Sequence, residues 1–229
     1  MTARLEAIDL SRELPGDPPT VLVAEASLAV ETGAFTAIVG PSGCGKSSLL
    51  YLLGLIDRPT GGTVLFDGKD MTPLDGDARS QIRLEHFGFV FQFHFLLPEF
   101  SALENVLIPI RRLGRLAPKA AEARAMEMLQ AMSLMGKEVK TPDHMSGVER
   151  QRVAIARALA NDPSVILGDE PTGNLDSGNS TAVVDIFRKL AHEQQRAVVC
   201  VTHDLEVAAA ADIRVSMLDG RIVEVVRQS

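Results

Sequence analysis

The sequence is poor in cysteine, which limits how the fold can be stabilised. Its 229 residues contain two cysteines, Cys44 and Cys200. Two cysteines cannot form the framework of a small disulfide-rich secreted domain, and they fit a reducing compartment. A chain of this length should bury roughly 70–75% of its unfolded surface on folding, so a hydrophobic core suffices without disulfide or metal cross-links.

Positive charge is also scarce. The chain has 23 Lys and Arg residues against 30 Asp and Glu residues, for a formal net charge of −7. Proteins that bind nucleic acids usually carry a broad positive field that neutralises phosphates. We therefore expect no nucleic-acid partner.

Long apolar runs are missing. The longest, Leu49–Ile56, is interrupted by Gly54 and is far shorter than the roughly 20 residues of a membrane-spanning helix. The first residues, Met1–Leu10, contain Arg4, Glu6 and Asp9, so they do not predict a signal peptide. We expect a cytosolic chain whose association with a membrane would need a partner.

Short β-rich runs alternate with helical patterns, which favours an α/β fold with a mostly parallel sheet. From Phe87 to Phe95, Phe occupies every second position, which predicts a strand with Gln92 as a candidate exit point from the sheet. Further segments are predicted as strands 35–39, 63–66, 164–168 and 197–202, helices 46–55 and 177–193, and hairpin turns at 67–68 and 219–220.

The middle of the chain, about 98–160, changes to helical patterns. Ser101 and Glu104 form a capping-box start, and Pro118 suits a first helical turn. We expect one domain over 1–229, with an α/β core formed by 1–92 and 161–229 and a helical subdomain over about 93–160.

The strongest motif is G-x-x-x-x-G-K-S at residues 40–47, between a predicted strand and a predicted helix. Its glycines let backbone N–H groups surround phosphate oxygens, Lys46 reaches the terminal phosphates, and the Ser47 hydroxyl can bind Mg²⁺. This context predicts a P-loop NTPase core. The candidate nucleotide-binding residues are Gly40, Pro41, Ser42, Gly43, Cys44, Gly45, Lys46, Ser47 and Ser48.

A second apolar strand ends in two carboxylates, Asp169 and Glu170. Beside a phosphate loop, Asp169 is a candidate Mg²⁺ ligand, through water, and Glu170 a candidate general base for the attacking water. The alternative is a solvated acidic turn. His203 follows the predicted strand 197–202, where it could contact the γ-phosphate or simply cap a helix. Ser146 and Glu149 form a further capping box before the predicted helix 153–160.

Together these segments resemble the ATP-binding subunit of an ABC transporter over nearly the whole chain. The resemblance implies a RecA-like P-loop core with an antiparallel β subdomain and a helical subdomain. It makes Gln92 a nucleotide and metal contact, Ser146, Gly147 and Glu149 the signature that contacts nucleotide, Asp176 a further contact, and Glu170 and His203 the catalytic pair. It implies ATP and Mg²⁺ as cofactors, and a homodimer of ATPase subunits bound to integral membrane permease subunits.

Within the family, residues 96–98, 102–106 and 172–176 resemble the branch that contains lipoprotein-releasing systems, macrolide exporters and a cell-division pair. The run 92–100 is most similar to the lipoprotein-releasing members, which places the chain at the cytoplasmic face of a bacterial inner membrane. The permease subunits would then handle the lipoprotein cargo. The alternatives are a macrolide-type exporter ATPase and a nucleotide-gated signalling module with little turnover.

Three positions depart from the family pattern. Val148 replaces the second glycine of the signature, where a β-branched side chain could reduce ATPase activity. Leu14 stands where the family has an aromatic residue that stacks on adenine, so we expect weak base selectivity. Cys44 lies within the phosphate loop, as a candidate oxidation site or a small inert filler.

Overall fold

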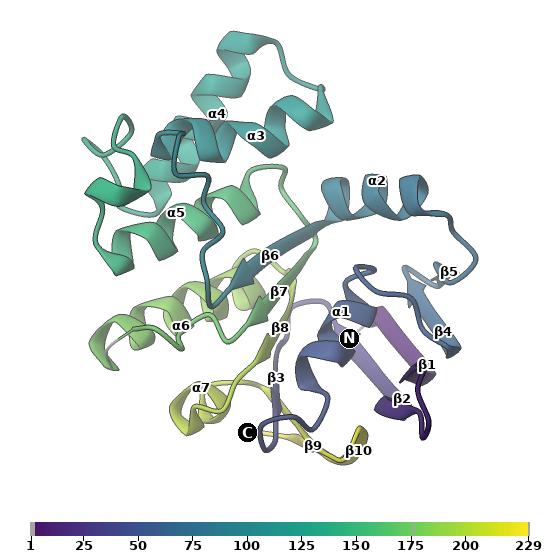
Figure 1. Ribbon diagram of the computed structural model, residues 1–229. Coiled ribbons are helices and arrows are strands. Elements are labelled where there is room, and N and C mark those ends of the chain that lie inside the picture. Colours follow the sequence, from purple (N-terminus) through teal and green to yellow (C-terminus); the bar gives the residue numbers. More distant parts are fainter. Residues whose placement is uncertain (1–2, 176, 229) are drawn as a thin grey trace.

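The computed structural model describes residues 3–175 and 177–228, in which the strands form two sheets (Figure 1). The strands are β1 (Ala3–Leu14), β2 (Thr20–Glu31), β3 (Phe35–Val39), β4 (Gly61–Phe66), β5 (Lys69–Asp70), β6 (Phe87–Phe91), β7 (Val165–Asp169), β8 (Ala197–Val201), β9 (Ile213–Leu218) and β10 (Arg221–Arg227). The helices are α1 (Lys46–Leu53), α2 (Gly76–His86), α3 (Ala102–Leu113), α4 (Pro118–Ala131), the 3₁₀ turn η1 (Pro142–His144), α5 (Gly147–Leu159), α6 (Ser177–His192) and α7 (Leu205–Ala209).

The larger sheet forms the centre of the molecule. Its strand order among the described residues is β10-β9-β3-β8-β7-β6, in which β9, β3, β8, β7 and β6 are parallel and β10 pairs antiparallel with β9. Side chains of β7 alternate between two hydrophobic cores: Ile166 packs in the core formed with α3–α6, whereas Val165 and Leu167 face the core formed with α1. Helices therefore cover both faces, as a parallel sheet requires.

The smaller sheet is antiparallel, with strand order β2-β1-β4-β5, and lies beside α1 (Figure 1). Leu5 pairs with Phe66 across β1 and β4, and Leu10 pairs with Ala26 across β1 and β2. All four side chains belong to the core that α1 shares with the central sheet. The small sheet thus closes the α1 side of the molecule.

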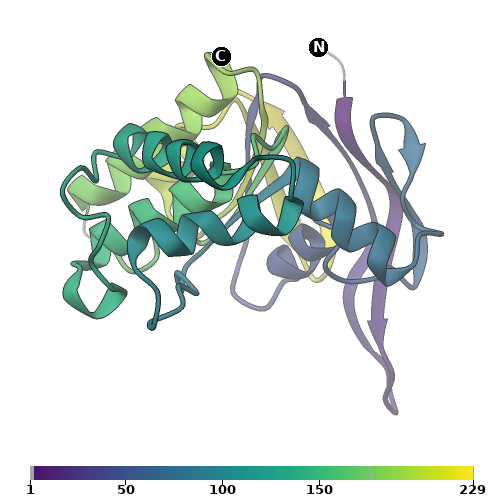
Figure 2. The same ribbon diagram turned by 90° about the horizontal axis from the view of Figure 1, so that it is seen from above.

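Helices α3, α4 and α5 pack together on the other side of the central sheet, as both views show (Figures 1 and 2). Asn105 of α3 is fully buried, and it orders the segment that leads into this group. Its side-chain amide donates to the carbonyl oxygens of Leu97, Phe100 and Ser101, and its oxygen accepts from the Leu97 N–H. The loop before α3 is therefore held by one buried side chain.

The predicted α/β fold, with its antiparallel and helical additions, is confirmed, and the strand of the Phe-rich run leaves the sheet at Gln92, the predicted exit point, but the predicted start of one helix is wrong. The strand predicted from Phe87 ends at Phe91; Phe93 and Phe95 are 65% and 64% exposed, and Phe95 has a left-handed φ of 47° that a strand does not allow. The helix predicted from residue 153 begins at Gly147, because the Ser146–Glu149 capping box starts it there. No helix among the described residues is long and apolar enough to cross a membrane.

Candidate nucleotide-binding site

The G-x-x-x-x-G-K-S loop joins β3 to α1, and two of its glycines are sterically required. Gly40 has a φ of +153° and Gly45 a φ of +98°. A Cβ on Gly40 would lie 2.3 Å from the carbonyl oxygen of Met217, and one on Gly45 would lie 2.1 Å from that of Leu22. The loop is therefore packed between β9 and β2, and this packing fixes its path.

Lys46 points back into the loop. Its ammonium group donates to the carbonyl oxygens of Gly40 and Pro41, each at 2.9 Å, and the residue is only 7% exposed. Gly45 is the N-cap of α1 and provides no side-chain cap for the first-turn N–H groups among the described residues. A buried ammonium beside an uncapped helix N-terminus is the environment that phosphate oxygens prefer, so this loop fits a nucleotide.

The remaining loop residues have different environments. Cys44 is buried, with its sulfur 4.0 Å from the ammonium nitrogen of Lys46. Ser42 and Gly43 are exposed, and Ser48 lies half-buried in the first turn of α1. A Cβ on Gly43 would meet no heavy atom within 4 Å, so this part of the loop is open.

Asp169, at the end of β7, accepts hydrogen bonds on both carboxylate oxygens. Oδ1 accepts from the Ser47 hydroxyl at 2.7 Å, and Oδ2 accepts from the Tyr51 hydroxyl at 2.6 Å. Burial, together with the hydrogen bond to Asp169 and its charge, raises the pKa of Tyr51 to about 12. Tyr51 was not predicted from the sequence, although its position one helical turn after Ser47 places both hydroxyls on the same face of α1.

The oxygen atoms of Ser47 and Asp169 suit Mg²⁺ chemically. Mg²⁺ prefers hard oxygen ligands and is usually held by one or two protein groups together with substrate phosphates and water. The hydrogen bond between the two side chains brings a hydroxyl and a carboxylate to one point beside the phosphate loop. Within residues 3–175 and 177–228 no cluster of three or more His, Cys, Asp or Glu side chains could hold a metal ion.

Glu170 and His203 lie in direct contact. Nδ1 of His203 is 3.1 Å from Oε1 of Glu170, because the Glu170 N–H donates to the carbonyl of Val201 and places the two strand ends side by side. Glu170 adopts a left-handed φ of 48°, an uncommon conformation for this residue type. The pair borders a cavity of about 370 Å³, which is also lined by Thr172, Gly173, Leu175, Ser180, Thr202, Asp204 and Glu206.

Gln92 contacts Asp169 through its backbone rather than its side chain. Its N–H donates to the Asp169 carbonyl at 2.9 Å. Its side-chain amide instead faces Asn174, with 3.4 Å between Nε2 and Oδ1, while the Asn174 amide donates to the Gln92 carbonyl. The side chain of Gln92 therefore contacts Asn174 and not the Ser47 and Asp169 side chains.

The signature residues lie apart from the phosphate loop. Ser146 is the N-cap of α5, and Glu149 completes a capping box with it while pairing with Lys137 at 3.1 Å. Gly147 is the first residue of α5. Figure 1 shows α5 with the other helices of the α3–α5 group, on the opposite side of the central sheet from α1. Asp176 lies outside the described residues.

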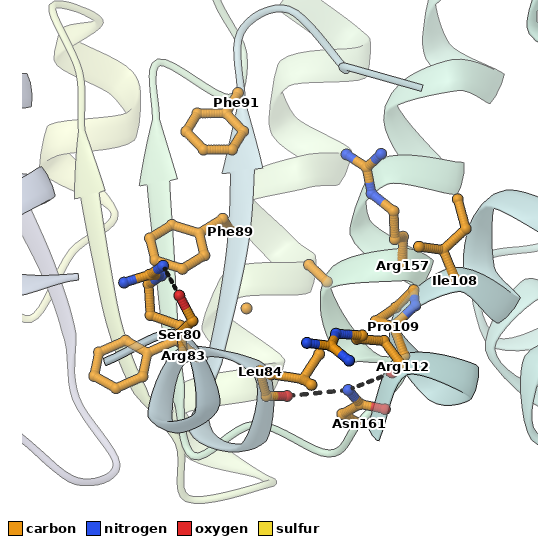
Figure 3. A pocket seen from close by; sticks show the side chains of 13 residues that line it. Ser80, Arg83, Leu84, Phe89, Phe91, Ile108, Pro109, Arg112, Arg157 and Asn161 are labelled. Carbon is orange, nitrogen blue, oxygen red and sulfur yellow. Dashed lines mark hydrogen bonds between the residues drawn. The ribbon is translucent and has the colours of Figure 1, made fainter. Parts of the chain in front are cut away.

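A groove of about 400 Å³ lies between β6, α2, α3 and α5 (Figure 3). Phe89 and Phe91 stack along one wall with ring centroids 6.0 Å apart, and Arg112 and Arg157 enter from α3 and α5. Arg157 also donates to the carbonyls of residues 94 and 95, which ties the segment after β6 to α5. Burial and two nearby arginines lower the pKa of His94 in this segment.

The comparisons with known proteins agree on one family. The ABC transporter family matches residues 23–173. A lipoprotein-releasing system ATP-binding protein, LolD 1 of Chlorobium chlorochromatii, is 46% identical over 96% of this chain and 89% of its own length.

Three solved structures are also similar. A dimeric post-hydrolysis state of the ATP-binding cassette MJ0796 bound to ADP and Pi has a TM-score of 0.91 and 35% identity, over 97% of this chain and 98% of its own. A second dimeric structure of MJ0796 has a TM-score of 0.91 and 36% identity, over the same shares of the two chains. CbiO1 from Clostridium perfringens, part of the transporter complex cbiONQ, shares the fold with a TM-score of 0.88 at 24% identity, over 99% of this chain and 89% of its own.

The phosphate loop, the strand-end carboxylates and these relatives lead to the same conclusion. The chain belongs to the ABC transporter family and is an ATP-binding protein of that family that hydrolyses ATP.

Proposed function

We propose that the chain drives release of outer-membrane lipoproteins from the inner membrane of a Gram-negative bacterium. The observation that carries this proposal is the 46% identity to a lipoprotein-releasing ATP-binding protein, which extends over 96% of the chain. The segment 92–100, which resembles the lipoprotein-releasing members in sequence, follows directly after Phe91 of the groove lining and carries the exposed Phe93 and Phe95 rings. This combination favours lipoprotein release over a macrolide-type exporter.

Hydrolysis is proposed to depend on Mg²⁺. Lys46 would neutralise the terminal phosphates, and Ser47 and Asp169 would hold the metal. Glu170 would accept a proton from the attacking water, and His203, in contact with its carboxylate, would orient that side chain and sense the γ-phosphate. Gln92 would come close to the metal only after its side chain turns away from Asn174.

The working unit is proposed to be a homodimer that encloses two ATP molecules. The N-terminus of α5, with Ser146 and Gly147, lies in the helical part of each chain, so it would complete the phosphate site of the partner chain. Glu149 and Asp176 would contribute to the same contact. The dimeric cassettes among the related structures support this arrangement.

Membrane permease subunits are the proposed partners at the groove lined by Phe89, Phe91 and Arg157. Apolar rings beside guanidinium groups favour an amphipathic helix that carries carboxylates. Such docking would place the chain at the cytoplasmic face of the inner membrane and leave the lipoprotein cargo to its partners.

The chain is proposed to form one domain, with an α/β core of residues 1–92 and 161–229 and a helical subdomain over about 93–160.

Two experiments test this function. The tagged chain should co-purify from detergent-solubilised membranes with four-span subunits that have a large periplasmic domain; a six-span permease in their place would contradict lipoprotein release. In the recovered complex, Glu170→Gln should abolish ATP hydrolysis and retain ATP binding. Full hydrolysis by this variant would contradict the role of Glu170 as general base.

A further inference from the structure

Tyr51 is the single tyrosine of a chain that contains no tryptophan, and its hydroxyl lies at the carboxylate of Asp169. The residue is half-buried in α1, with its ring packed against the core between α1 and the small sheet. Packing alone would be satisfied by phenylalanine. The hydroxyl therefore needs an explanation of its own.

The two hydrogen bonds to Asp169 divide its carboxylate oxygens. Ser47 binds Oδ1 at 2.7 Å and Tyr51 binds Oδ2 at 2.6 Å. Because both hydroxyls come from one rigid helix, they fix the rotation of the carboxylate about its last bond. Oδ1 is then directed towards Ser47, which is the other proposed oxygen ligand. Without the Tyr51 hydroxyl, only the hydrogen bond from Ser47 would restrain the rotation of the carboxylate.

Hydrogen bonds from outer groups commonly orient metal-binding side chains, and their loss weakens metal binding by roughly 10–100-fold in well-characterised sites. The geometry here matches that pattern, since Tyr51 contacts the carboxylate oxygen that faces away from Ser47. The Asp169 backbone is held as well, because its carbonyl accepts from the Gln92 N–H. Tyr51 thus completes the fixation of Asp169.

We propose that Tyr51 is a positioning residue of the metal site, which holds Asp169 in the orientation that binds Mg²⁺ beside the nucleotide phosphates. The inference rests on the Mg²⁺ dependence proposed above. It assigns to Tyr51 a role in metal affinity and no contact with the reacting atoms.

The test is calorimetric titration with ADP, in Mg²⁺ and in EDTA, of the wild type, Tyr51→Phe and Thr36→Val. For each protein, the ADP affinity in Mg²⁺ divided by the ADP affinity in EDTA gives the gain in affinity that is due to the metal. Tyr51→Phe should reduce this gain about 10- to 100-fold with the EDTA affinity unchanged, as expected for loss of one outer hydrogen bond to a charged metal-binding group. Thr36→Val is the matched control, because it removes a buried hydroxyl of β3 that has no hydrogen-bond partner among the described residues.

The outcomes separate the two proposals. If the wild type binds ADP more tightly in Mg²⁺ and Tyr51→Phe shows the same increase, the role of Tyr51 is overturned and the Mg²⁺ site stands. If the wild type binds ADP no more tightly in Mg²⁺ than in EDTA, both the Mg²⁺ site and the role of Tyr51 are overturned. Equal loss in Thr36→Val would also overturn the role, since a general loosening of the fold would then account for the effect.

Tyrosine emission gives a second measurement on the unmodified protein. With one tyrosine and no tryptophan, the ultraviolet emission of the chain comes from Tyr51 when it is excited at wavelengths that phenylalanine does not absorb. Paramagnetic Mn²⁺, added with ADP, should quench this emission saturably, and Mg²⁺ should displace the Mn²⁺ and restore it. Emission that Mn²⁺ leaves unchanged at saturating ADP would overturn the placement of Tyr51 beside the metal.

Discussion

Gly43 and Gly45 offer a matched pair for testing how the phosphate loop is held. Both have left-handed φ angles, +80° and +98°. A Cβ on Gly45 would lie 2.1 Å from the Leu22 carbonyl oxygen, whereas real Cβ atoms essentially never approach within 3.0 Å, and a Cβ on Gly43 would meet nothing within 4 Å. Alanine at either position therefore introduces similar backbone strain, but only Gly45→Ala adds a clash with β2.

The magnitudes follow from this difference. Left-handed strain costs roughly 1–2 kcal/mol, and the smaller entropy of the unfolded alanine chain offsets about 0.4–1 kcal/mol, so Gly43→Ala should lose about 1 kcal/mol. Displacing a packed backbone carbonyl adds the cost of overpacking, about 1–3 kcal/mol. Gly45→Ala should therefore lose about 2–4 kcal/mol of unfolding free energy.

Urea unfolding of the nucleotide-free variants, followed by far-ultraviolet circular dichroism, measures both losses without interference from ligand contacts. A difference of about 2 kcal/mol should also lower the melting temperature of Gly45→Ala by roughly 4–8 °C relative to Gly43→Ala. Equal losses, or a larger loss in Gly43→Ala, would refute the conclusion that contact with β2 fixes the loop.

Three further predictions concern the departures from the family pattern and the segment after β6. Val148→Gly should raise the steady-state ATPase rate, because a β-branched side chain is removed from the first turn of α5; equal rates would contradict this. GTP should compete with ATP to within about tenfold, roughly 1.4 kcal/mol, because Leu14 cannot stack on a base as an aromatic ring would, and stronger discrimination in a competition assay would contradict it. The pKa of His94 lies below its usual 6.5, so the unfolded chain takes up a proton that the folded chain resists. The unfolding free energy should therefore fall as the pH drops below about 6.5, and His94→Gln should fall less steeply in acid denaturant titrations; parallel curves would argue against a role of His94.

The central sheet could be predicted because its strands have local signals. Residues of β8 are continuously apolar, and those of β7 are apolar up to Asp169 at its end, which is the pattern of strands buried on both faces. The hairpin of β1 and β2 gives no such signal. Its register shifts three times between Ala7 and Glu13, so alternation of apolar and polar residues is interrupted. Its position depends on tertiary contacts, namely pairing with β4 and packing in the core shared with α1.

The candidate site was predictable where chemistry and spacing coincide. The phosphate-loop residues form one continuous motif, and Lys46 points into that loop as the motif requires. The Gln92 side chain faces Asn174, a partner 82 residues away that no local pattern predicts. The contact of Tyr51 with Asp169 likewise joins α1 to the end of β7, 118 residues further along the chain. Such contacts depend on how elements pack, which the sequence of either element alone does not contain.

The buried Asn105 has a thermodynamic consequence for the surface next to it. Four hydrogen bonds hold the loop that carries Leu97 and Phe100, both partly exposed, before any other protein arrives. Immobilising a flexible side chain at an interface costs about 0.5–1.5 kcal/mol, and ordering a loop costs more. Here that entropy is already lost during folding, so association at this loop can proceed as a rigid-body encounter, with its affinity governed by shape rather than by ordering.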